Sequence, residues 1–90
     1  MATKFVTPIK WTRTRSNIPL RVRESRNTER GLYSQGKRTD YLIVPVLDSW
    51  DMSQIVGWDL VVNPGTHDER TYGYVHQRNA KECAAMIEAR

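Results

Sequence analysis

The pattern that most constrains the fold lies in residues 40–90, where three apolar stretches are separated by turn residues and followed by a helical pattern. Residues 41–47 form a continuous apolar run, which is typical of a strand covered on both faces. Residues 54–62 and 71–77 alternate between two faces, as strands do. Strands joined by short turns pair with their neighbours, so this order predicts an antiparallel three-stranded meander.

Three positions within the meander predict local backbone features. Pro45 has no N–H to donate, so we expect the strand either to lie at a sheet edge there or to carry a bulge. Gly57 in mid-strand predicts a bulge or a close approach of another backbone segment. Residues 63–66, Asn-Pro-Gly-Thr, predict a turn in which proline fixes φ and glycine supplies a positive φ.

The last stretch of the chain predicts a helix that covers one face of the sheet. Residues 81–89 contain neither Gly nor Pro, which favours a helix. Asn79 and Glu82 have the spacing of a capping box, so we expect Asn79 to be the N-cap. Residues three and four apart form one apolar stripe on such a helix. The predicted stripe consists of Cys83, Met86 and Ile87.

The N-terminal part predicts a β-hairpin with a basic outer face. Apolar and polar side chains alternate strictly in residues 18–23, which is the pattern of a half-buried strand. Residues 9–15 are rich in Thr, Ile and Trp, which suit the partner strand. Ser16 and Asn17 between the two stretches supply turn chemistry. Residues 24–39 are predicted as a long polar loop, a length that is uncommon in compact domains unless the segment is functional or disordered.

These elements predict one small α+β domain over residues 1–90. The basic hairpin and loop occupy residues 8–39, and the meander and helix occupy residues 40–90. We expect a mainly antiparallel sheet of about five strands, the N-terminal hairpin plus the three-stranded meander, with one C-terminal helix packed on it. A chain of 90 residues buries enough surface for a single modest core.

Charge is distributed unevenly along the chain. Residues 1–39 hold ten cations against two anions, hence +8, and residues 40–90 hold four cations against eight anions, hence −4. Such asymmetry points to a polyanionic partner. The alternative is that the two parts complement each other's charge within the fold, although exposed ion pairs contribute little to stability.

The chain shows no pattern typical of an enzyme. It has no nucleophile-elbow motif, no phosphate-binding glycine loop and no Cys/His zinc pattern. The spacing of His67, Asp68 and His76 matches no known ligand pattern, so we expect no metal site and no cofactor. The single cysteine, Cys83, is interpreted as a small buried hydrophobe in a reducing compartment. The N-terminus has no apolar run of signal-peptide type, and we expect a cytoplasmic protein.

The arginine-rich part is the candidate functional site. Arginine binds phosphate well because its planar fork donates two parallel hydrogen bonds, and a two-stranded ribbon fits the major groove of DNA. The expected function is therefore non-catalytic binding of nucleic acid, DNA or RNA. The candidate nucleic-acid-binding residues are Arg13, Arg15, Arg21, Arg23, Arg26, Arg30, Lys37 and Arg38.

A second hypothesis is a protein-binding inhibitor or adaptor that docks on an acidic partner surface. Trp11 and Trp58 are expected in the core, whereas Trp50, in a turn between two aspartates, is either a lid on the core or an exposed anchor for a partner. The composition resembles that of small virus- or phage-type regulators. The strand-strand-strand-helix layout resembles, in topology alone, the arm-binding domains of integrases. A homodimer that pairs through a sheet edge is a third possibility.

Overall fold

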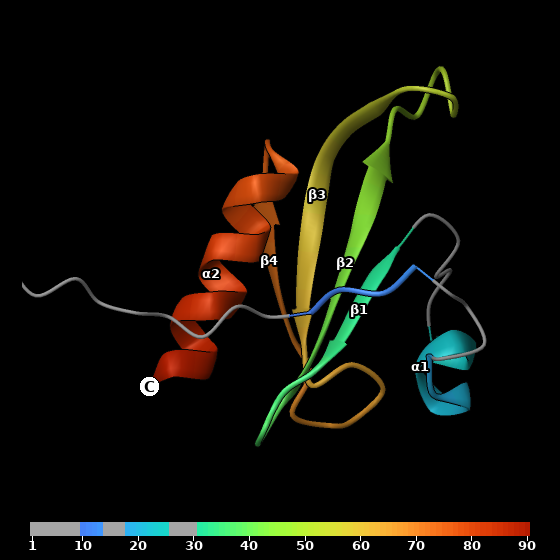
Figure 1. Cartoon of the computed structure of the whole chain (residues 1–90). Coiled ribbons are helices and arrows are strands. Elements are labelled where there is room, and N and C mark those ends of the chain that lie inside the picture. The colour runs from blue at the N-terminus through green and yellow to red at the C-terminus, as the bar shows by residue number, and fades with distance from the viewer. Residues whose placement is uncertain (1–9, 14–17, 26–30) are drawn as a thin grey trace, which may run out of the picture.

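The structure is a computed structural model that describes residues 10–13, 18–25 and 31–90. The elements described are α1 (Leu20–Ser25), β1 (Leu32–Gln35), β2 (Asp40–Leu47), β3 (Ile55–Val62), β4 (Arg70–Tyr74) and α2 (Gln77–Ala89). Within these residues the strands form one four-stranded antiparallel sheet in the order β1-β2-β3-β4 (Figure 1). The predicted α+β fold, with the C-terminal helix α2 packed on an antiparallel sheet, is confirmed.

The centre of the sheet is buried on both faces. Tyr41 and Ile43 of β2 belong to the core that lies under α2, whereas Leu42 and Val44 face α1 on the opposite side. All four consecutive side chains are buried. Their continuous apolar character therefore has the predicted cause, because alternate residues of one strand meet a cover on each face.

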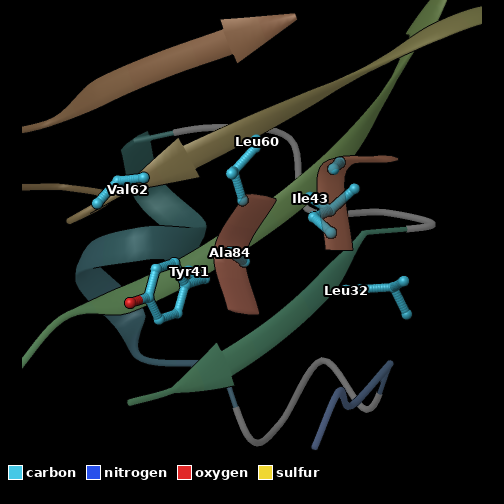
Figure 2. Packing of buried hydrophobic residues seen from close by; sticks show 7 residues of the cluster. Leu32, Tyr41, Ile43, Leu60, Val62 and Ala84 are labelled. Atoms are coloured by element: carbon cyan, nitrogen blue, oxygen red, sulfur yellow. The ribbon is translucent and has the colours of Figure 1, made fainter. Parts of the chain in front are cut away.

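The main core lies between the sheet and α2, and Figure 2 shows its side chains seen from close by. Small side chains at Ala80 and Ala84, one helical turn apart, are fully buried and allow the helix to lie close to the sheet. Large side chains from the strands fill the rest of the layer. The buried members of this cluster are Leu32, Tyr41, Ile43, Leu60, Val62, Ala80 and Ala84. Trp11 and Trp58 pack against it half-buried, in agreement with their expected place in the core.

Two details of α2 differ from the prediction. The helix begins at Gln77, with His76 as its N-cap (φ −114°, ψ 139°) and no side-chain cap bond. The predicted N-cap Asn79 therefore lies inside the helix, because the chain turns immediately after β4 ends. Cys83 and Ile87 do pack against the core. Met86 does not: 61% of its surface is exposed, because the buried stripe follows the alanines.

The predicted N-terminal hairpin is wrong. Residues 20–25 form the helix α1, and only Thr12 of the described part of residues 9–15 bridges a strand. Pro19 directly precedes the first helical residue, where its missing N–H costs no intrahelical bond, and its carbonyl accepts the N–H of Val22 (3.0 Å). Ile18 and Val22 are four residues apart, so they lie on one side of this turn and are both buried. The turn predicted at residues 16–17 lies outside the described residues.

The predicted loop at residues 24–39 contains a strand instead. Leu32–Gln35 form β1, which pairs with β2 along its whole length. On the other side of β1, Thr12 and Tyr33 exchange two backbone hydrogen bonds of 2.9 Å. Short strands of this kind are hard to see in sequence because four residues give too few alternations to establish a period.

The predictions for Pro45, Gly57 and the turn at residues 63–66 are confirmed. β1 pairs with β2 no further than Ile43, so Pro45 lies on an edge of the sheet, and the register shifts at Val46/Leu47. A Cβ at Gly57 would lie 3.0 Å from the Tyr74 carbonyl oxygen. Asn63 and Gly65 have positive φ values of 56° and 79°.

In the part of the chain that the structure describes, no helix has the length and apolar character needed to cross a membrane.

The β2–β3 hairpin extends beyond the rest of the sheet. β1 stops at the level of Ile43 and β4 stops at the level of Trp58, which pairs with Pro45, so residues 46–57 form a two-stranded arm. This arm and its tip, residues 48–54, project from the body of the molecule (Figure 1). The opposite end of β2 leads into the turn of residues 36–39, which lies close to the C-terminal end of α2.

Candidate nucleic-acid interface

The predicted basic residues that the structure describes do not form a single strand face. Arg21 and Arg23 lie in the helix α1, and the half-buried Arg23 donates from Nε to the Ile18 carbonyl at 3.1 Å. Residues 21 and 23 therefore lie in a helix and not in the predicted hairpin strand. Arg13 is exposed beside the bridge of Thr12. Arg15, Arg26 and Arg30 lie outside the described residues.

Lys37 and Arg38 are exposed in the turn between β1 and β2. The turn is closed by a 2.9 Å hydrogen bond from the Gly36 N–H to the Thr39 carbonyl. A Cβ at residue 36 would lie 2.6 Å from the Thr39 oxygen and would also overlap the Glu88 carboxylate. Glycine is thus required here by close approach, and the turn holds its two cations at a defined place at the end of the sheet.

Glu88 of α2 ties this turn to the helix. One carboxylate oxygen accepts the backbone N–H of Lys37 at 2.8 Å, and the other accepts the Tyr41 hydroxyl at 2.9 Å. Burial of the phenol, and then its hydrogen bond to Glu88, raise the pKa of Tyr41 well above its ordinary value. The bond to residue 37 uses the main chain, so the Lys37 side chain is not committed to the carboxylate by this contact.

A pocket of about 350 Å³ opens between the turn and the last turn of α2. It is lined by Lys37, Arg38, Thr39, Tyr41, Ile87, Glu88, Ala89 and Arg90. Three of these residues are cations and one is an anion, which gives the lining a net charge of +2. Two of the cations were predicted site residues. The third, Arg90, was not, because it is 52 positions from Arg38 in the sequence and comes near it only through the packing of α2.

This pocket has the chemistry of an anion site. Lysine and arginine donate charge-assisted hydrogen bonds to phosphate or carboxylate oxygens, and these bonds are stronger than neutral ones. The exposed position of Lys37, Arg38 and Arg90 leaves them accessible to a large ligand as well as to a small one. Among the described residues, no group of three or more His, Cys, Asp or Glu is placed to hold a metal ion.

The predicted partner anchor Trp50 lies at the tip of the arm, with 95% of its surface exposed. Of the two alternatives for Trp50, a lid on the core is excluded by this exposure, and its role as a partner anchor stays a prediction. The backbone N–H of Trp50 donates to Asp48 Oδ1 at 2.9 Å, and the backbone N–H of Ser53 donates to Asp51 Oδ1 at 3.0 Å. These side-chain-to-backbone bonds stabilise the turn at the tip, from which the indole is exposed.

The fold and these two features define a small α+β domain with a basic pocket at one end and an exposed aromatic tip at the other. No protein-family model, curated protein or solved structure matches this chain.

Proposed function

We propose that this protein is a non-catalytic nucleic-acid-binding protein whose basic surface contacts the phosphate backbone. The observation that carries the proposal is the pocket at the end of the sheet, where Lys37, Arg38 and Arg90 lie together at the surface. These cations belong to elements far apart in the sequence, and Glu88 holds the two elements together. Exposed cations that a fixed scaffold groups at one place suit the repeating negative charge of nucleic acid.

The charge of the whole N-terminal part supports the same proposal. Residues 1–39 carry a net charge of +8, which favours a strongly anionic ligand and rapid, non-specific association. Backbone contacts of this type position a protein on nucleic acid without reading its sequence. The expected activity is therefore binding with little base preference, to DNA or RNA.

A salt titration of binding to labelled, random-sequence DNA and RNA tests the proposal. Each phosphate neutralised contributes about −0.9 for duplex DNA, or about −0.7 for a single strand, to the slope of log K against log salt concentration. We expect affinity to fall by orders of magnitude between about 50 and 200 mM salt, as it does for proteins with several phosphate contacts. Failure of the wild-type protein to bind at the lower salt concentration would overturn the proposal.

A double variant locates the contact. In Lys37→Ala with Arg38→Ala, the backbone N–H of residue 37 still bonds to Glu88, so the turn is expected to keep its shape. Loss of two phosphate contacts should reduce the duplex-DNA slope by about 1.8. The matched comparison is Arg90→Ala against Arg78→Ala, two exposed arginines near opposite ends of α2. Binding that is weakened by the same amount per charge removed in all these variants, Arg78→Ala included, would reflect net charge alone and would exclude the pocket as the contact.

The alternative function, docking on an acidic protein surface, uses the same cations. A protein partner would make affinity depend on an aromatic or apolar anchor and less steeply on salt. A shallow salt dependence with a partner protein, together with absence of binding to nucleic acid, would favour this alternative.

A further inference from the structure

The tip of the arm combines an exposed apolar surface with negative charge. Trp50 is 95% exposed, and Met52 is 64% exposed on the same tip. Residues 47–57 contain Asp48 and Asp51 and neither lysine, arginine nor histidine. Hydrogen bonds from the Ser53 side chain and backbone lower the pKa of Asp51 below its ordinary value, so this charge persists over a wide pH range.

Local hydrogen bonds stabilise the turn at the tip. The Asp48 N–H donates to the Gln54 carbonyl, and the Gln54 N–H donates to the Asp51 carbonyl, both at 2.9 Å. The aspartate side chains add the bonds to Trp50 and Ser53 described above. A backbone turn that is already hydrogen-bonded loses less conformational entropy on binding, and tryptophan is among the residue types enriched at the energetic centres of interfaces.

The two aspartates decide which class of partner fits. Phosphate groups of nucleic acid or of anionic lipid would be repelled by the charge of the tip. A complementary surface has room for an indole and is bordered by cations, which attract the carboxylates and also the face of the ring. The protein itself carries such a surface: the pocket of about 350 Å³ lined by Lys37, Arg38 and Arg90, with the half-buried Ile87 as an apolar member of its lining.

One molecule cannot join its own tip to its own pocket. The turn that contains Lys37 and Arg38 precedes β2 and the tip follows it, and the eight residues of this strand span about 26 Å at ~3.3 Å per residue. Figure 1 shows the tip and the C-terminal end of α2 on opposite sides of the molecule. Any contact between these two surfaces must therefore be made between copies.

We propose that this protein self-associates head to tail, with the tip around Trp50 of one copy seated in the basic pocket of the next. Such a contact is heterologous, so it forms open chains or rings rather than a closed two-fold dimer. One loop in one pocket buries less than the ~1,200 Å² typical of stable complexes. Association is consequently weak, concentration-dependent and reduced by salt.

Sedimentation velocity at increasing protein concentration and low salt tests the proposal. The wild-type protein is expected to rise above the monomer mass of 10.5 kDa without stopping at a dimer. Trp50→Ala and the double variant Lys37→Ala with Arg38→Ala are each expected to stay monomeric. Met86→Ala removes an exposed apolar side chain of α2 and should associate like the wild type. All substituted side chains are exposed, and circular dichroism checks that each variant is folded.

Mixing the two inactive variants provides the decisive measurement. Trp50→Ala keeps an intact pocket and the double variant keeps an intact tip, so together they can form one interface and no more. The expected product is a 1:1 complex of about 21 kDa, twice the mass of 10.5 kDa, that does not grow further. Three outcomes would each overturn head-to-tail assembly: the wild-type protein remains monomeric, either variant alone associates like the wild type, or the mixture of the two variants forms no pair.

The inference uses the same pocket as the proposed function but does not rest on it. Trp50 lies at the other end of β2 from the turn that holds Lys37 and Arg38, so Trp50→Ala should leave binding of DNA or RNA by a single molecule intact. A wild-type protein that binds nucleic acid and stays monomeric would overturn head-to-tail assembly alone. A wild-type protein that assembles and does not bind nucleic acid at low salt would overturn the proposed function alone.

Discussion

The inner and outer halves of strand β3 have similar apolar side chains in opposite surroundings. Leu60 and Val61 are fully buried, whereas Ile55 and Val56 on the same strand are 36% and 53% exposed. The inner half has β2 and β4 beside it and helices over its faces, and the outer half belongs to the two-stranded arm. Apolar periodicity thus predicts that a segment is a strand, whereas the burial of that strand depends on which other strands and helices pack against it. Apolar surface left on the arm is surface available to a partner.

The two halves should differ most in how much the free energy of unfolding falls when one side chain in each half is truncated to alanine. Leu60→Ala removes a fully buried side chain between the sheet and α2, and such changes cost about 2–5 kcal/mol of the free energy of unfolding. Val56→Ala on the exposed arm should change it by no more than about 0.5 kcal/mol. Denaturant unfolding of both variants measures the values. Equal losses would show that the arm is part of the core rather than a projection from it.

A smaller effect is expected where the sheet meets the C-terminal end of α2. Gly36→Ala places a Cβ against the Thr39 carbonyl and the Glu88 carboxylate, so we expect a loss of about 1–3 kcal/mol, typical of an overpacked site. Gly73→Ala in β4 is the matched control, because its Cβ would meet Asp59 Oδ1 at an ordinary 3.6 Å. Thermal and denaturant unfolding compare the two. A Gly36 variant as stable as the Gly73 variant would mean that the turn and helix do not meet as described.

Tyr41→Phe should show an effect that depends on pH. The folded state raises the pKa of Tyr41, so it favours the neutral phenol. The corresponding stability is present below the ordinary tyrosine pKa of about 10 and is lost as pH rises above it. At pH 7 the variant loses one hydrogen bond to Glu88, worth about 0.5–1.5 kcal/mol.

Above pH 10 the stability of the wild type should fall more steeply than that of Tyr41→Phe, so the difference between them narrows. The hydrogen bond with Cys83 is the main cause that raises the pKa of Tyr74 to about 12. Tyr74 is present in both proteins, so it lowers the stability of both by the same amount as pH rises. Denaturant unfolding between pH 7 and 11 measures the two curves. Parallel curves over this range would contradict a buried, hydrogen-bonded Tyr41.

The fold of residues 40–90 could be predicted because its signals are local and agree with one another. A continuous apolar run, alternating stretches and a Pro-Gly turn each indicate the same meander. The N-terminal part could not be predicted in this way. Ile18 and Val22 are four residues apart, which fits one face of a strand as well as one side of a helical turn, and six residues cannot distinguish the two periods. Packing of this turn against Leu42 and Val61 decides the outcome, and that contact is not visible in sequence.

The sequence indicated several residues of the candidate site but not how these residues are arranged in space. Lys37 and Arg38 stood out as members of a basic segment, and Trp50 as an aromatic residue in an acidic turn. Arg90 gave no signal, because its approach to Lys37 depends on the Glu88 contacts between α2 and the turn. Arg23 was misplaced for the same reason that α1 was. Long-range packing therefore determines which charges form a site, whereas sequence determines which charges exist.

Trp50→Ala should have the smallest effect on stability, although it is expected to abolish head-to-tail assembly. Its side chain is almost entirely exposed, so the free energy of unfolding is expected to change by no more than about 0.5 kcal/mol. If both proposals hold, phosphate and the tip compete for the same cations. An oligonucleotide should then lower the mass of wild-type assemblies in sedimentation, and Trp50→Ala should bind that oligonucleotide somewhat more tightly at high protein concentration. Oligonucleotide that joins the assemblies without shortening them would show that the tip and the phosphates use different surfaces, because one pocket cannot hold both ligands at once.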